Sequence, residues 1–305
     1  MGAHGHDHDH GHHDGGTGRL ALVFALTVAY TAFEIVGGLL SNSLALLADA
    51  GHMMTDNLAL GIALVAAWSA KRPPGPTRTY GYGRAEILAA LANGSLLLGV
   101  AGFVAWEALS RLREPPEVRV GIMAAIAAGG LLVNAFAAIW LHGAGHRSLN
   151  VRAAYLHVLG DLLGSIGALA AAGIMRFSGA RWPDPVVSLL IAVFLAVSSS
   201  RLLREAVHVL MEGAPRGVDA ASIQQCLSMV RGVSSVHDLH VWSLAGGTPL
   251  LTAHLVSDHS RPTAAILRDA TAALAERFAI THTTLQIEPP DYNVVVETAT
   301  TIADR

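Results

Sequence analysis

The sequence predicts a membrane protein with an all-α domain of six transmembrane helices and a C-terminal α+β domain of the ferredoxin-like α-β-β-α-β order. The 305-residue chain is 52% hydrophobic and only 14% charged, whereas an ordinary soluble domain has about 25% charged residues. Six apolar runs are each near the ~20 residues that cross a bilayer. They end near residue 210, and the remainder has the alternating pattern of a small soluble domain.

The first segment, residues 1–18, has low complexity and holds six of the sixteen histidines. It has nothing apolar to bury, so we expect a disordered His-rich tail. Because Asp and Gly interrupt the histidines at irregular spacing, the pattern favours a native metal-collecting tail over a plain polyhistidine tag.

The predicted transmembrane domain covers residues 19–212. Its apolar runs span residues 20–40, 43–69, 85–109, 118–141, 151–177 and 185–210. Only Ser41 and Asn42 separate the first two runs, which predicts a tight helical hairpin. With the N-terminus in the cytoplasm, the inner side carries nine Lys and Arg and the outer side five. The excess of inner cations predicts a multi-pass protein with both termini cytoplasmic.

Two of the predicted spans carry the same pair of residue types, a His and an Asp, which are unfavourable within a membrane. His52 and Asp56 in the second span, and His157 and Asp161 in the fifth, are each four residues apart, so each pair lies on one helix face. Asp49, three residues before His52, shares that face. A centrally placed Asp costs about 2.5–3.5 kcal/mol on insertion scales. Two imidazoles and two carboxylates form a four-ligand set suited to a tetrahedral divalent metal such as zinc.

Other polar residues in or near the spans leave two interpretations open. Glu34, Asn134 and similar residues either line a water-filled path or form hydrogen bonds between helices. His142 and His146, also four residues apart, precede the fifth span. They either relay metal from the cytosol or lie at a solvated helix end.

The C-terminal domain is predicted over residues 213–290, followed by a tail at 291–305. Helices are expected at 218–230 and 262–278, and strands at 233–244, 250–256 and 281–288. This order suggests a ferredoxin-like fold. The domain is rich in potential ligands, and the candidates for a second metal site are His237, His240, His254, His282 and Glu288. The alternative is that some are ordinary surface histidines.

Composition excludes several classes of protein. The net charge is −3, and no basic patch with interleaved aromatic residues predicts nucleic-acid binding. Cys226 is the single cysteine, which excludes a disulfide or a multi-thiolate metal site within one chain. An enzymatic metal site is also disfavoured, because four protein ligands leave no open position for water.

Four stretches together resemble the cation diffusion facilitator family of zinc-exporting proton antiporters. They are SNSLALLADAGHMMTDNLAL, YGYGRAEILAALANG, LNVRAAYLHVLGDLLGS, and VHDLHVWSL with THTTLQIE. With the six-span layout and the His-rich start, the resemblance covers nearly the whole chain.

The resemblance implies a homodimer in a bacterial inner membrane, in which each protomer has one transport site, here His52, Asp56, His157 and Asp161. A His at the first of these positions is associated with zinc, and an Asp with broader acceptance of cadmium. Several further assignments follow from it: regulatory zinc in the cytoplasmic domain at His237, His254, His282 and Glu288, and a charge pair between Arg84 and Glu212.

The sequence departs from some relatives at two places. The loop at residues 71–83 has neither Asp nor His, so we expect no metal site there. Gln286 stands where some bacterial relatives have a ligand His, which predicts a weaker or single-metal cytoplasmic site. The predicted function is export of zinc in exchange for protons. Efflux of cobalt, cadmium, iron or manganese and a metal sensor without flux are the alternatives.

Overall fold

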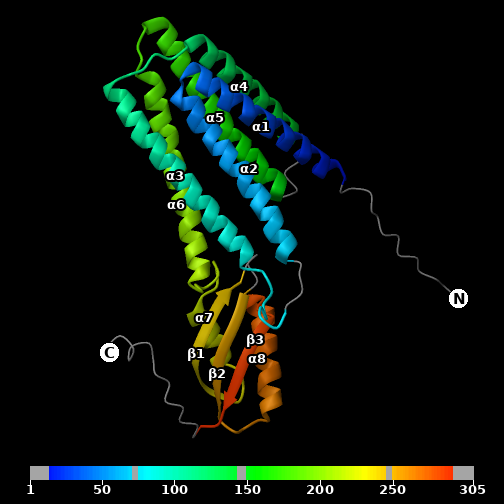
Figure 1. Cartoon of the computed structure of the whole chain (residues 1–305). Helices are drawn as coiled ribbons and strands as arrows, with labels where there is room; N and C mark the ends of the chain where they lie inside the picture. Colours follow the sequence, from blue (N-terminus) through cyan, green and yellow to red (C-terminus); the bar gives the residue numbers. More distant parts are fainter. Residues whose placement is uncertain (1–13, 71–74, 143–148, 245–248, 291–305) are drawn as a thin grey trace, which may run out of the picture. The chain divides into compact units, whose positions relative to one another are not determined.

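The computed structural model describes residues 14–70, 75–142, 149–244 and 249–290 (Figure 1). The chain divides into two compact units. The first comprises Met1–Val65 and Ala89–Leu203, and the second comprises Ala66–Leu88 and Arg204–Arg305. The first unit is helical, and the second contains the sheet.

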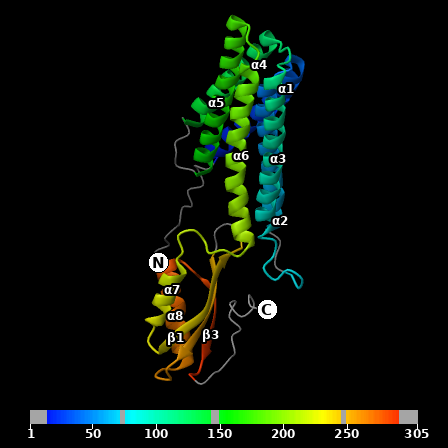
Figure 2. The same cartoon turned by 90° about the vertical axis from the view of Figure 1, so that its left-hand side faces the viewer.

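Six long helices follow one another from the N-terminal end, as Figures 1 and 2 show. They are α1 (Asp14–Ser41), α2 (Leu44–Ala70), α3 (Ala85–Arg113), α4 (Val120–His142), α5 (Leu149–Ser178) and α6 (Pro183–Leu210). Residues 14–18, predicted as part of a disordered tail, belong to α1 instead. Among the described residues, five helices are long and apolar enough to cross a membrane.

The packing places α2 between two groups of helices. On one side, Leu46 shares a buried cluster with Met123 of α4 and Ala168 of α5. On the other, Leu44 and its neighbours share a cluster with residues of α3 and α6, including Val104. Because both faces of α2 are covered, polar side chains on this helix are held within the bundle.

A buried carboxylate fixes the start of α2. Asp184 in the first turn of α6 is 0% exposed. It accepts hydrogen bonds from the Ser43 hydroxyl (2.5 Å) and from the backbone amides of Leu44 (2.9 Å) and Ala45 (3.2 Å). Unpaired amides at a helix N-terminus favour an anion. Asp184 thus ties α2 to α6 at the end of the bundle where the α1–α2 turn lies.

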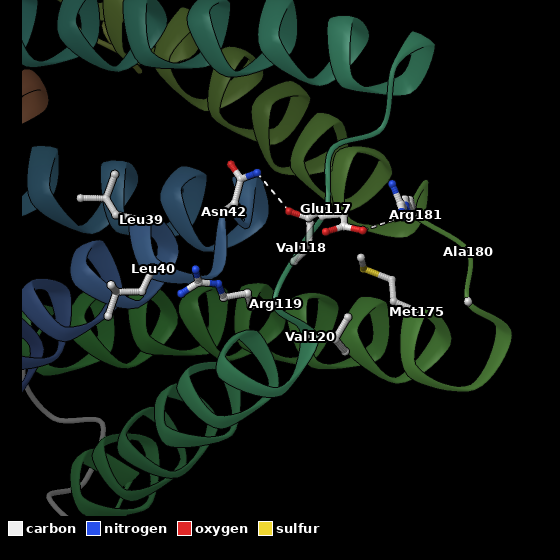
Figure 3. A pocket seen from close by; sticks show the side chains of 11 residues that line it. Leu39, Leu40, Asn42, Glu117, Val118, Arg119, Val120, Met175, Ala180 and Arg181 are labelled. Atoms are coloured by element: carbon white, nitrogen blue, oxygen red, sulfur yellow. Dashed lines mark hydrogen bonds and ion pairs between the residues drawn. The ribbon is translucent and has the colours of Figure 1, made fainter.

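The same end of the bundle carries a surface pocket between the end of α1 and the two loops that follow α3 and α5 (Figure 3). The Asn42 amide donates to the carbonyl oxygen of Glu117 at 3.1 Å, and Arg181 donates to the Glu117 carboxylate at 3.0 Å. These contacts join the loops. None of the predicted ligands lines this pocket.

The second unit has a three-stranded sheet of order β1-β2-β3 with two helices. Its elements are α7 (Ala220–Ser228), β1 (Val233–Ser243), β2 (Pro249–Ser257), α8 (Thr263–Phe278) and β3 (His282–Glu288). β1 pairs antiparallel and β3 parallel with β2. Figure 2 shows both helices on one side of the sheet. Leu227 of α7, Leu255 of β2 and Ile266 of α8 meet in the core. This confirms the predicted α-β-β-α-β order.

The helix α7 begins with a strong cap. The Ser222 hydroxyl and the amides of Ser222 and Ala221 donate to Asp219 and hold the pKa of that carboxyl below its usual range. The stability that this cap supplies is therefore present at neutral pH and is lost as the pH falls through the lowered pKa.

We predict that Asp184→Ala destabilises the bundle. The change leaves three donors without their acceptor. Each buried unmet donor costs about 1–3 kcal/mol, so the free energy of unfolding should fall by at least ~2 kcal/mol. Denaturant or thermal unfolding in detergent micelles measures this. The matched control is Glu117→Ala at the same end of the bundle. It removes an exposed ion pair worth about 0–1 kcal/mol. Equal losses for both variants would contradict the capping role.

Candidate metal centres

Three of the four residues predicted for the transport site have described side chains, and the structure brings them together. His52 Nδ1 lies 3.4 Å from Asp56 Oδ2 within α2. His52 Nε2 lies 3.9 Å from Asp161 Oδ1 of α5. The imidazole therefore bridges the two helices, with a carboxylate oxygen near each ring nitrogen.

The fourth residue, His157, lies on α5 one turn before Asp161, and its side chain is outside the described part of the structure. The Asp161 side chain is 1% exposed, whereas those of His52 and Asp56 are 18% and 25% exposed. One member is thus deeply buried, and the others reach toward solvent-accessible space. Such a set can hold a divalent cation and neutralise its charge with two carboxylates.

Asp49, which the sequence placed on the helix face of His52, also has a neighbour on α1. It is 3% exposed, and its carboxyl group interacts with that of Glu34 on α1. Asp49 and His52 also line one cavity, together with residues of α5 and α6. From the sequence, Glu34 was only one polar residue among several, because its meeting with Asp49 depends on how α1 packs against α2.

A second cluster lies on the sheet of the other unit. Glu288 Oε2 is 2.9 Å from His237 Nε2, and Glu288 Oε1 is 2.8 Å from His254 Nδ1. One ligand atom from each residue lies within 4.8 Å of the other two. Two imidazoles and one carboxylate form a donor set typical of zinc, and an open position remains for another ligand.

Strand register explains this cluster. His237 of β1 pairs with His254 of β2, and Glu288 of β3 pairs with the residue two places beyond His254. Ala253 and Leu255 point into the helix-covered core, so the intervening His254 points to the opposite face. A bulge after His237 interrupts the pairing of β1. The cluster therefore lies on the sheet face that the helices leave open.

The structure does not bring His282 into this cluster within one chain. His282 begins β3, whereas Glu288 ends it, and six residues of strand extend about 20 Å. The His282 ring contacts Tyr80 at a centroid distance of 6.1 Å. A ligand role for His282 stays a prediction.

The remaining candidates lie apart from the cluster or outside the described residues. His240 Nε2 is 3.0 Å from Asp238, whose other oxygen is 3.6 Å from His254 Nε2. Asp238, which has a positive φ of 50°, is thus a neighbour of the cluster that the predicted ligand set omitted. His142 ends α4, but its side chain is outside the described part, as is all of His146.

Gln286 also contacts the cluster. Its amide donates to Glu288 Oε1 at 2.9 Å. A neutral amide at this place adds no charge for a second cation, so the geometry agrees with the expectation of a weaker or single-metal site.

The predicted charge pair forms. Arg84, just before α3, donates to Glu212, just after α6, at 2.7 Å. The two side chains are 40% and 60% exposed, and exposed pairs contribute only about 0.2–1 kcal/mol.

Comparison with known families covers both units. The family model described as the cation efflux transmembrane domain matches residues 20–211, and that described as the cation efflux protein cytoplasmic domain matches residues 215–290. The chain belongs to the cation efflux family. It is therefore a membrane protein that exports metal cations, and the resemblance to cation diffusion facilitators is confirmed.

Curated relatives match over almost the whole chain. The metal cation efflux system protein CzcD of Cupriavidus metallidurans is 44% identical over 94% of this chain and 90% of its own length. The zinc transporter ZitB of Escherichia coli is 42% identical over 94% and 92%. A cadmium, cobalt and zinc/H(+)-K(+) antiporter of Bacillus subtilis is 38% identical over 90% and 89%.

One solved structure is also similar, the metal-bound C-terminal domain of the CzcD transporter. It is 40% identical, covers 23% of this chain and 99% of its own, and has a TM-score of 0.23.

We predict that zinc stabilises the sheet domain through His237, His254 and Glu288. Zinc at 100 times its Kd should add about 2.7 kcal/mol to the free energy of unfolding. The measurement is the zinc-dependent shift in unfolding temperature of the full chain, on an Asp161→Asn background that disables the other site. His254→Ala should lose the shift, and His282→Ala tests whether His282 is a further ligand. An unchanged shift in His254→Ala would contradict the arrangement.

Proposed function

We propose that the protein exports zinc from the cytoplasm in exchange for protons, and that His52, Asp56, His157 and Asp161 hold the cation during transport. The observation that supports this most strongly is the convergence of His52 with Asp56 and with Asp161 of another helix. The names of ZitB and of the Bacillus antiporter support zinc as substrate and protons as counter-ion.

The mechanism follows from the chemistry of the four groups. A ligand histidine must be neutral, so zinc displaces protons from any imidazole that it binds. Two carboxylates balance the charge of a bound divalent cation, and the loaded site is nearly neutral within the apolar bundle. Protons compete with zinc when the site faces outward, and their return inward completes the exchange.

The sheet domain has a regulatory role in this proposal. Zinc at His237, His254 and Glu288 can shift the transporter toward one state only if that state binds it more tightly. We place both termini and this domain in the cytoplasm, and the protein in a bacterial inner membrane as a homodimer. The unequal loop charges and the family resemblance support this placement. In this proposal residues 19–212 carry out transport and residues 213–290 regulate it, as expected from the sequence. We propose no enzymatic activity.

Other metals are the main alternative substrates. Imidazole ligands suit cobalt as well as zinc, and the Bacillus relative is named for cadmium and cobalt too. A metal sensor without flux would use the same ligands. Transport measurements separate a zinc exporter, an exporter of another metal and a sensor without flux.

We predict zinc flux in proteoliposomes driven by an imposed pH gradient and unaffected by a potassium gradient. Asp161→Asn should reduce flux to background, because it removes a buried charge that balances the cation. His52→Asp should raise cadmium flux relative to zinc, because a carboxylate replaces a nitrogen ligand. Glu107→Gln is the control, since Glu107 pairs with Arg111 of its own helix at 2.8 Å.

Three outcomes would overturn parts of the proposal. Zinc binding without flux would indicate a sensor. Flux of manganese or cobalt in preference to zinc would change the substrate. Full zinc flux in Asp161→Asn would exclude the proposed ligands.

A further inference from the structure

The described part of the bundle contains two buried carboxyl groups that have no basic partner. Glu34 of α1 is 1% exposed and Asp49 of α2 is 3% exposed. One oxygen of each, Glu34 Oε2 and Asp49 Oδ2, has no hydrogen-bond partner among the described residues. The two groups interact with each other, and both also interact with the charge of Asp161. Buried like charges are unfavourable unless a cation or a proton compensates them.

Further oxygen atoms lie near Glu34. The Tyr30 hydroxyl lies 3.5 Å from Glu34 Oε1 and donates to the carbonyl oxygen of Ile126 at 3.0 Å. A Cβ added at Gly130 of α4 would come within 2.8 Å of both the Tyr30 hydroxyl and the Ser165 hydroxyl of α5. The hydroxyls of Tyr30 and Ser165 therefore lie close to each other beside Gly130. The ligand atoms that Glu34, Asp49 and Tyr30 offer are oxygens, and His52 lines the same cavity as Asp49.

The position of the pair relates it to the transport site. Asp49 precedes His52 by three residues, which is about 4.5 Å along a helix axis. Asp49 is five residues from the start of α2, and Glu34 is seven residues from the end of α1. Both carboxyl groups thus lie between His52 and the α1–α2 turn. In the proposed orientation this is the outward side.

We infer that Glu34 and Asp49 form a second cation station on the outward side of the transport site. The inference rests on the proposed function and adds a second position to it. An exported divalent cation passes from the mixed nitrogen and oxygen ligands around His52 to oxygen ligands at this pair, and then leaves. Oxygen ligands hold zinc less selectively than imidazole and accept manganese well. Such a station favours release.

Glycines of α5 provide a geometric test. A Cβ at Gly164 would lie 2.7 Å from Asp49 Oδ1, so Gly164→Ala must displace this carboxylate. A Cβ at Gly173, farther along the same helix and outside this cavity, would meet nothing within 4 Å. Gly173→Ala is therefore a matched control.

The decisive experiment counts bound metal in the purified full chain by equilibrium dialysis against Mn²⁺ and, separately, Zn²⁺. A His52→Ala/Asp161→Asn background removes the transport site. Adding Glu34→Gln to this background should remove one Mn²⁺ per protomer, or weaken its binding at least about tenfold. Adding Glu107→Gln should change nothing. An unchanged count with Glu34→Gln would overturn the inference and show that the two carboxyl groups share only a proton.

Zinc flux in proteoliposomes provides the second readout on the otherwise native chain. Glu34→Gln and Gly164→Ala should lower kcat about tenfold while KM changes little, because cytoplasmic loading still uses His52. Gly173→Ala should keep the native kcat. A rise in KM alone would contradict an outward station. The metal count is made on a chain without the transport site. The count therefore tests the second station even if the proposed transport ligands are wrong, and the two failures can be told apart.

Discussion

The structure depends on keeping carboxylates inside an apolar helical bundle. Asp161 is 1% exposed, and Asp49 and Glu34 are buried nearly as completely. The cost of burying such groups is several kcal/mol each unless a cation or proton compensates. A bundle with this arrangement is most stable when something positive is bound. The stability of the helical unit therefore depends on the cation or proton that it binds.

Helix α2 meets this requirement because it is packed on both sides. Its apolar residues join two clusters, one with α4 and α5 and one with α3 and α6. Its first turn is capped by Asp184, itself buried. The helix that carries His52 and Asp56 is therefore fixed over its first turns, whereas Leu58 farther along it is exposed. Ligands on a constrained helix keep their geometry better than ligands on loops.

Much of this could be predicted from the sequence, for physical reasons that also explain the failures. Helical periodicity placed His52 beside Asp56, and the strand pattern of the C-terminal domain predicted the α-β-β-α-β order. The relative position of two residues within one helix or strand follows from their spacing in the sequence, so it can be predicted. The meeting of Glu34 with Asp49 depends on packing between helices. The separation of His282 from Glu288 depends on distance along a strand, which a shared face does not reveal.

The central claim is that zinc and protons compete for the same imidazoles in the transport site. The most direct measurement is the number of protons released when zinc binds, by calorimetry in buffers of different ionisation enthalpy, on a His254→Ala background that disables the sheet site. We expect zinc binding to release protons in the native chain, and this release to be smaller in His52→Ala. Zinc binding with no proton release at any pH, or with release unchanged in His52→Ala, would contradict it.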